Sequence, residues 1–218
     1  MSADIYEDDL ALYAKTAWHN KGQVHGELID LDTYLDYPWP FVAQREPLYV
    51  KNPTRVQWSA AKNSNDIDTK RAIENHELNG GYEPRPFIPI ELFEGVKDHY
   101  VIRRSDNGYP LNIGVTEQRA LTQYHMMDEV VASLLERGFA TGVESKGTLQ
   151  HGRKGYVTLQ VGEPIDIENY SKINRYFTLA DAHDSSVSLS ARPTLGVVVC
   201  ANTFAAYVLN NDTATWTI

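Results

Sequence analysis

The segment whose side chains could do the most chemistry is residues 179–207, LADAHDSSVSLSARPTLGVVVCANTFAAY. It contains a His183-Asp184 pair followed by two serines, and it ends near Cys200, the single cysteine of the chain. A histidine and an aspartate beside Ser186 are the residue types of a hydrolase, and a His-Asp pair can also contribute ligands to a metal site. Both hypotheses need further groups.

The sequence completes neither site. A metal site would need a histidine from far along the chain, such as His19, His25 or His125. The chain has no GxSxG motif and no glycine-rich phosphate loop with a lysine. In a turn, by contrast, the Asp184 and Ser186 side chains can bond to nearby backbone groups. We therefore expect a hydrogen-bonded turn without metal or cofactor, and a hydrolase is the last of the functions considered.

A second candidate is the basic segment 146–156, KGTLQHGRKGY, which has the pattern of a β-hairpin. Its cations could follow the phosphates of a single nucleic-acid strand while its tyrosine stacks on a base. The residues proposed for this interface are Lys146, His151, Arg153, Lys154 and Tyr156, with Arg103 and Arg104 extending the patch. The alternative is a solvated hairpin tip, and the net charge of −9 argues mildly against a general nucleic-acid binder.

Cys200 follows an apolar run, residues 197–199, so we expect it to be buried. A lone cysteine excludes a disulfide within the chain and the zinc patterns that need several cysteines. The run predicts a buried segment that enters a helix near Asn202 or Thr203, with Asn202 capping that helix or bonding to the His183 turn.

These motifs need elements to position them, and residues 98–218 have clear patterns. Alternation on both sides of Asp106-Asn107-Gly108 predicts a hairpin. Apolar residues at helical spacing predict a long helix over about 116–137, with Thr116 as N-cap and Gly138 after its end. Its Met and Tyr stripe indicates core packing. A second hairpin over 139–162 and further strands follow.

The fold class is therefore predicted as α+β, an antiparallel sheet of hairpins packed on the long helix and a C-terminal helix. Residues 1–97 are rich in proline and aromatics without sustained periodicity, so we expect an irregular arm that packs on the core, residues 98–218. Two short helices are predicted in this arm, over 6–18 and 66–78. The chain as a whole is expected to form a single domain.

Composition limits the class of protein further. Hydrophobic residues make up 42% and charged residues 22% of the 218 residues, as in ordinary globular proteins. No apolar run approaches the roughly 20 residues that a membrane helix needs, so we expect no membrane partner. The N-terminus carries acids where a secretory signal carries Lys or Arg, which predicts that no signal peptide is present.

Residues 183–203, HDSSVSLSARPTLGVVVCANT, resemble the signature of the uncharacterised phage/plasmid-like family known as domain of unknown function nine-three-two. That family has a His-Asp-Gly-Ser turn, a strand, and a Val-Cys-x-Asn-Thr segment opening a helix. The matching residues, read as a structural signature, are His183, Asp184, Ser185, Ser186, Arg192, Cys200, Asn202 and Thr203. TAWHNKGQ, YVIRRSDNGYPLNIGV and KGTLQHGRKGYVTLQVGEPIDI resemble further family elements.

The resemblance extends from Tyr100 to about Tyr207, with two departures. Ser185 stands where glycine is usual, and the chain stops soon after Asn202, where longer members continue. The family implies a phage, prophage or plasmid source, and hence a location in the host cytoplasm or in the virion. It implies no activity that can be assigned to individual residues.

Three functions remain open at this point. The first is a non-enzymatic protein that binds or anneals single-stranded DNA in phage recombination or replication, working as a homo-oligomer. The second is a structural subunit of a virion or phage assembly, which the acidic charge and the many aromatics suit. The third is a hydrolase centred on His183-Asp184.

Overall fold

The computed structural model describes residues 5–15, 17, 20–51, 93–166, 172–209 and 216–217. The chain divides into two compact units, one formed by Met1–Glu46 with Val101–Ile218 and the other by Pro47–Tyr100. The helix predicted over residues 66–78 lies outside the described residues. The division into an arm and a core near residue 97 stays a prediction.

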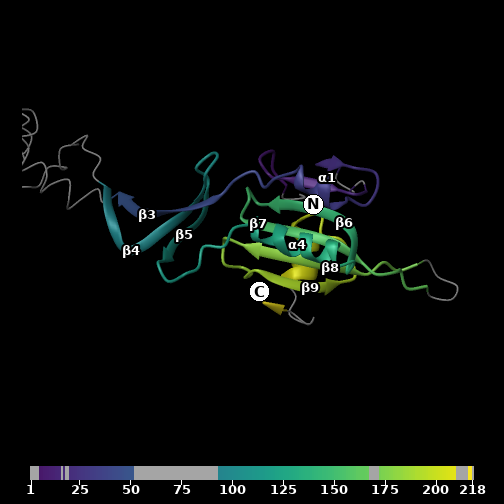
Figure 1. Cartoon of the computed structure of the whole chain (residues 1–218). Coiled ribbons are helices and arrows are strands. Elements are labelled where there is room, and N and C mark those ends of the chain that lie inside the picture. Colours follow the sequence, from purple (N-terminus) through teal and green to yellow (C-terminus); the bar gives the residue numbers. More distant parts are fainter. Residues whose placement is uncertain are drawn as a thin grey trace, which may run out of the picture. The chain divides into compact units, whose positions relative to one another are not determined.

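Seven strands among the described residues form one sheet in the order β10-β9-β8-β7-β6-β1-β2 (Figure 1). They are β1 (Ala11–Tyr13), β2 (Gln23–Val24), β6 (Ala140–Leu149), β7 (Lys154–Val161), β8 (Tyr176–Ala182), β9 (Ser190–Thr194) and β10 (Trp216–Thr217). Neighbouring strands pair antiparallel except β1 and β2, which are parallel. The predicted mixed α+β class is confirmed, with strands outnumbering short helices.

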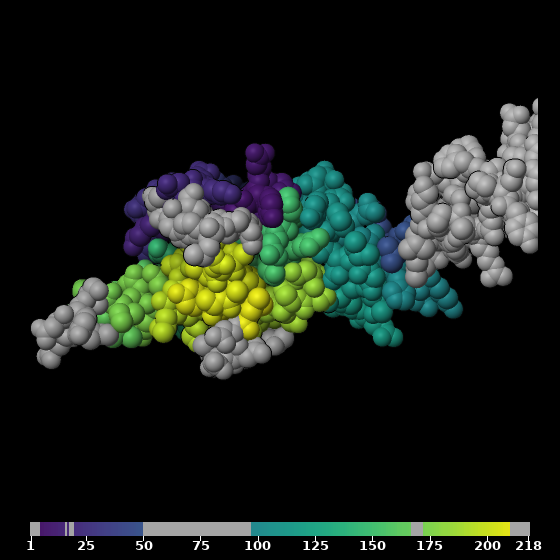
Figure 2. Space-filling model, turned by 180° about the vertical axis from the view of Figure 1, so that it is seen from behind, coloured from purple at the N-terminus to yellow at the C-terminus, as the bar shows by residue number. Residues whose placement is uncertain are grey.

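Both faces of the central strands are covered. Val157 and Leu159 of β7 belong to a cluster that includes Val131 of the helix α4 (Met126–Glu136). The intervening Tyr156 belongs to a second cluster, with Phe204 near the C-terminus. Figure 2 shows this C-terminal segment, in yellow, on the side of the unit seen from behind. Since both faces are buried, even the polar side chains of β6 and β7 are enclosed.

A separate three-stranded sheet has the order β3-β4-β5, with β3 (Ala43–Lys51), β4 (Phe93–Arg104) and β5 (Pro110–Thr116). The predicted hairpin is confirmed here, because β4 and β5 flank the Asp106-Asn107-Gly108 turn. The N–H of Arg104 donates to the carbonyl of Tyr109 at 3.0 Å, and Gly108 has a positive φ of 71°. Asn and Gly at the turn tolerate this conformation.

The prediction of a long helix over 116–137 is wrong for the first half of that range. The described helix α4 covers Met126–Glu136, and Thr116 is the last residue of β5 instead of an N-cap. Tertiary contacts explain the difference, because the Gln123 side chain pairs with the backbone of Ala43 at 2.8 and 2.9 Å and Thr122 donates to Asp181. These contacts hold the segment before α4 in turns.

The predicted C-terminal helix is present as α5 (Ala201–Phe204), which continues as a π-helical turn, η1 (Ala205–Leu209). The helix predicted over 6–18 is wrong, because Ala11–Tyr13 form β1 and pair with β6. A short helix that the sequence did not indicate, α1 (Leu31–Leu35), begins at Asp30, whose carboxylate accepts from the N–H of Thr33 at 2.8 Å. No helix in the described part of the chain has the length and apolar character to cross a membrane.

Candidate functional site

Three turns and the N-terminal segment 6–10 meet at one end of the seven-stranded sheet, and we call this group the turn cluster. The turns are residues 105–109 between β4 and β5, 150–153 between β6 and β7, and 183–186 between β8 and β9. The Asn107 amide donates to the Asp8 carboxylate at 3.3 Å, and the N–H of His183 donates to the carbonyl of Arg153 at 2.8 Å. The two motifs singled out in the sequence therefore lie side by side.

The turn between β6 and β7 has a backbone conformation that L-residues rarely adopt. Gln150, His151 and Gly152 have φ values of 57°, 60° and 85°. The Asp9 carboxylate supports this conformation by accepting from the N–H groups of His151 at 3.2 Å and Gly152 at 2.7 Å. A Cβ at Gly152 would lie 2.4 Å from the Phe41 ring, so glycine is required there.

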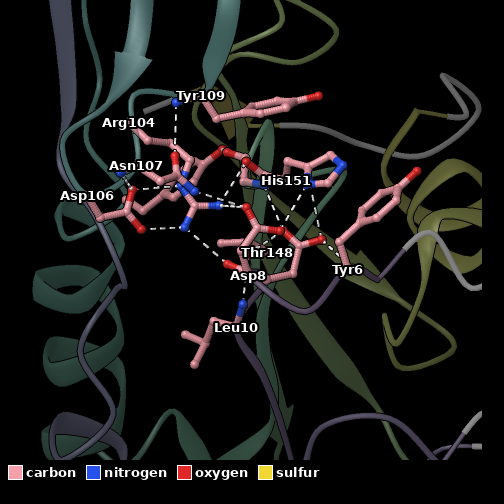
Figure 3. A network of polar contacts seen from close by, with 12 residues as sticks. Tyr6, Asp8, Leu10, Arg104, Asp106, Asn107, Tyr109, Thr148 and His151 are labelled. Carbon is pink, nitrogen blue, oxygen red and sulfur yellow. Dashed lines mark hydrogen bonds and ion pairs between the residues drawn. The ribbon is translucent and has the colours of Figure 1, made fainter.

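A buried arginine links β4 to the turn cluster. Arg104 is 2% exposed, and its guanidinium donates to Asp8 at 2.7 Å, to Asp106 at 2.6 Å and to the carbonyl of His151 at 3.1 Å (Figure 3). The same group lies 4.4 Å from the centre of the Phe41 ring. Arg104 was predicted to contact phosphate, but its charge is compensated inside the protein.

Three aromatic rings form a row beside this network, and we call Tyr6, His151 and Tyr109 the aromatic row (Figure 3). The Tyr6 and His151 rings stack with centroids 3.7 Å apart, and His151 lies 4.5 Å from the Tyr109 ring. The Arg153 guanidinium lies 5.7 Å from the centre of the Tyr109 ring. Asp8 holds the imidazole through Nδ1 at 2.9 Å, and Tyr6 remains 44% exposed.

Sequence reasoning identified His151 and Arg153 but missed Tyr6, Asp8 and Tyr109. Tyr109 follows the predicted turn directly, which is a weak local signal for a residue at a hairpin end. Tyr6 has no such signal, because the residue it stacks on lies far along the chain. The fold alone brings these groups together.

Two of the proposed nucleic-acid contacts are enclosed by the sheet. Lys146 is 1% exposed, with its ammonium 3.4 Å from Asp128 and 3.9 Å from the centre of the Tyr34 ring. Burial lowers the pKa of Lys146, an effect that Asp128 partly offsets. Tyr156 is fully buried, and its hydroxyl lies 3.4 Å from that of Tyr13. Neither side chain reaches a ligand without a rearrangement, so we leave both out of the interface proposed below.

The other proposed contacts are nearer the surface, and each of the two cations described next is paired with a different carboxylate. The Lys154 ammonium lies 3.2 Å from the Asp184 carboxylate, so the two motifs share an ion pair. The Arg103 side chain is 45% exposed and lies 3.4 Å from Glu46. Ion pairs as exposed as this one are weak, and a competing phosphate can replace the carboxylate.

The His183 turn is held by hydrogen bonds. Asp184 accepts from the N–H of Ser186 at 2.9 Å, in the manner expected from the sequence. The Ser185 hydroxyl accepts from the Asn112 amide at 2.9 Å and from Arg119. Ser185 has a positive φ of 74°, which explains why a glycine would suit this position.

Electrostatics at this turn follow from its burial. His183 is 3% exposed and packs on Tyr124, with ring centroids 4.5 Å apart. Burial, assisted by the nearby Arg119 charge, lowers the pKa of His183 to about 4. Burial acts to raise the pKa of Asp184, but the hydrogen bonds from Ser186 and the Lys154 charge outweigh it and lower that pKa overall. Within the described ranges no three His, Cys, Asp or Glu side chains are grouped to hold a metal.

The rest of the signature lies on β9 and around the start of α5. Arg192 sits on β9 opposite Thr178. Cys200 is buried, as predicted, and forms the N-cap of α5. The Thr203 hydroxyl accepts from the N–H groups of Val199 at 2.9 Å and Cys200 at 3.0 Å, while the predicted role of Asn202 stays a prediction.

Replacing Cys200 with Ala is expected to lower the free energy of unfolding by about 1–3 kcal/mol, because it removes a buried sulfur and leaves a small cavity. Thr203 still caps α5 in this variant, so the helix should persist. Urea denaturation followed by circular dichroism measures the change. Loss of any binding activity in a folded Cys200→Ala protein would contradict a purely structural role.

Part of the chain matches a family of known sequences. The model of the family described as Domain of unknown function (DUF932) matches residues 115–218. No curated protein and no solved structure matches the chain. The matched residues 115–218 include α4, the β6–β7 hairpin and the His183 turn, and the matching family is the one that the sequence signature resembles.

Proposed function

We propose that this chain is a non-enzymatic, phage- or plasmid-encoded protein that binds single-stranded DNA through the aromatic row. The observation that carries the proposal is a stack of rings, exposed at Tyr6, with a cation beside it. Tyr6 stacks on His151 at 3.7 Å, and Arg153 lies next to Tyr109. Proteins that bind single strands combine aromatic platforms for bases with cations that follow the backbone.

The mode of binding follows from the exposure and charge of the side chains in and beside the aromatic row. Tyr6 is among the exposed aromatics, so one base can stack where its ring meets solvent. The Asp8 carboxylate lies 2.9 Å from Nδ1 of His151, and this contact keeps the imidazole rigid before a ligand arrives. Arg153 supplies charge for a phosphate, because its side chain is only partly buried and its guanidinium lies beside the Tyr109 ring. A preorganised platform loses little entropy on binding.

Stacking and charge can be separated experimentally. Tyr6→Ala and Tyr109→Ala should each weaken oligonucleotide binding by about 1–3 kcal/mol and leave the salt dependence unchanged, since stacking releases no ions. Arg153→Ala should reduce the slope of log K against log salt by about 0.7, the value for one phosphate contact on a single strand. Fluorescence anisotropy of a labelled oligonucleotide over a salt series measures both quantities.

Matched controls lie at the far end of β8. Tyr176 pairs with Gln160 there, and Arg175 bonds to the carbonyl of Glu163 at 2.8 Å. Tyr176→Ala and Arg175→Ala should leave affinity and slope as in the unaltered chain. If no oligonucleotide binds even at low salt, the proposal is wrong.

A second candidate, a subunit of a virion or phage assembly, is favoured by a different observation. Large apolar side chains are exposed on this chain, among them Leu195 at 82%, Ile113 and Phe139. Exposed apolar side chains become buried where such a surface meets a neighbouring subunit. Sedimentation analysis with and without oligonucleotide distinguishes the two, because an assembly subunit should associate without DNA.

The hydrolase is the weakest of the three alternatives. The His183 imidazole lies beneath the surface against Tyr124, and its pKa is lowered to about 4. A substrate would reach the ring only after the turn had moved.

A further inference from the structure

A pocket of about 410 Å³ adjoins the aromatic row. Its volume is within the range of about 300–1,000 Å³ usual for ligand pockets. Tyr6 lines it, together with Ile5, Glu7, Asp9, Leu10 and Lys21. Tyr6 therefore belongs both to the stack on His151 and to the pocket wall.

We infer that this pocket receives one base of the bound strand, and that it selects a base with an exocyclic amino group, such as cytosine. The inference rests on the proposed single-strand binding function. Apolar and aromatic walls suit the two faces of a base, while the polar groups contact its edge. Ile5 and Leu10 supply the apolar surface, and Tyr6 supplies the ring.

Two carboxylates line the pocket, those of Glu7 and Asp9, and only the Glu7 carboxylate is free to accept a hydrogen bond from the edge of a base. Asp9 is a fixed part of the wall, because its oxygens accept from the N–H of Tyr6 at 3.1 Å and from Thr148 at 2.9 Å as well as from the turn between β6 and β7. Burial raises the pKa of Asp9, and these hydrogen bonds oppose the rise. Glu7 is exposed and lines the same pocket, so it is the acceptor available to a base.

A carboxylate acceptor favours some bases over others. Glu and Asp accept from the amino group of cytosine, which is their usual base-edge contact. Thymine carries carbonyl oxygens on both sides of its one N–H, so one of them would face the Glu7 carboxylate and be repelled. Glu7 therefore gives the pocket a preference for cytosine over thymine.

Lys21 supplies the opposite charge. Its ammonium donates to the carbonyl of Ile5 at 2.9 Å, which holds it at the pocket. The phosphate attached to the bound nucleotide can approach this ammonium while the base occupies the apolar part. Lys21 thus offsets the repulsion between the Glu7 and Asp9 carboxylates and the nucleic-acid backbone.

The test compares oligo(dC) and oligo(dT) of equal length by anisotropy at low salt. The unaltered chain should bind oligo(dC) about tenfold more tightly, the lower part of the range for a base-edge contact. Glu7→Ala should abolish that preference, whereas Glu27→Ala, which removes an equal charge from an exposed position that does not line the pocket, should keep it. Leu10→Trp, which fills the pocket, should weaken oligo(dC) binding and leave oligo(dT) binding nearly unchanged.

The outcomes separate the two proposals. Equal affinity for oligo(dC) and oligo(dT), or a preference that survives Glu7→Ala, would overturn the pocket assignment while single-strand binding still stands. Absence of binding to either oligonucleotide would overturn the proposed function itself. Thermal melting of Glu7→Ala and Leu10→Trp confirms that both variants are folded before affinities are compared.

Discussion

Replacing Arg104 with Met is expected to lower the free energy of unfolding by about 3 kcal/mol, near the lower end of the cost of breaking a buried ion pair. Met keeps an unbranched side chain at this position but removes the guanidinium, which lies over the Phe41 ring and contacts Asp8 and Asp106 at 2.7 and 2.6 Å. The two carboxylates then face each other across an uncharged side chain. Their partial exposure, 30% and 35%, keeps the expected cost from being higher.

The neighbouring arginine is the natural control. Arg103 precedes Arg104 on β4, is 45% exposed, and pairs with Glu46 at 3.4 Å. Arg103→Met should therefore change stability by no more than about 0.5 kcal/mol. Arg104→Lys should fall between the two, because an ammonium keeps the charge but cannot bond to both carboxylates in the planar geometry of a guanidinium. Urea denaturation measures all three variants, and equal stability of Arg104→Met and Arg103→Met would refute the role assigned to Arg104.

Local signals in the sequence were enough to place the hairpins and the C-terminal helix. The Asp106-Asn107-Gly108 turn was predictable because its conformation depends on the residues of the turn itself. The helix over 116–137 was predicted too long, because the stripe of apolar residues continues through a segment that Gln123 and Thr122 hold outside the helix. No local pattern reveals such tertiary contacts.

The site was predictable in part for the same reason. His151 and Arg153 stand in a glycine-containing turn, so their place at a hairpin tip could be read locally. Lys146 has the same appearance in the sequence, yet β6 lies inside the sheet between β1 and β7, and Tyr34 covers its ammonium. Alternation of apolar and polar residues indicates one exposed face and fails where both faces of a strand are buried. The aromatic row depends on contacts of His151 with Tyr6 and Tyr109, which lie far from it along the chain, and spacing does not encode such contacts.

Acid is expected to destabilise this protein through His183. Burial lowers the pKa of this imidazole from 6.5 to about 4, with Arg119 acting in the same direction and Asp184 against it. The unfolded chain therefore binds the proton more tightly than the folded one. The contribution of His183 to stability is fully present above pH 6.5 and is lost as the pH falls towards 4. A difference of about 2.5 pH units corresponds to about 3 kcal/mol.

His183→Phe isolates this contribution. A phenyl ring can keep the packing on Tyr124, and the Nε2 atom that it replaces has no hydrogen-bond partner among the described residues. Burial raises the pKa values of Asp9 and Asp181, so their protonation favours the fold and partly masks the histidine in the unaltered chain. The measured quantity is consequently the difference between the two stability curves, from urea denaturation at a series of pH values between 4 and 7.

That difference should change by about 3 kcal/mol across this range, with His183→Phe relatively more stable at the acid end. His25→Gln is the control, because His25 is exposed and its replacement should leave the pH dependence of the unaltered chain intact. Parallel curves for the unaltered chain and His183→Phe would mean that the imidazole is accessible to protons in the folded state. The turn would then be open, and a catalytic role for His183 would regain support.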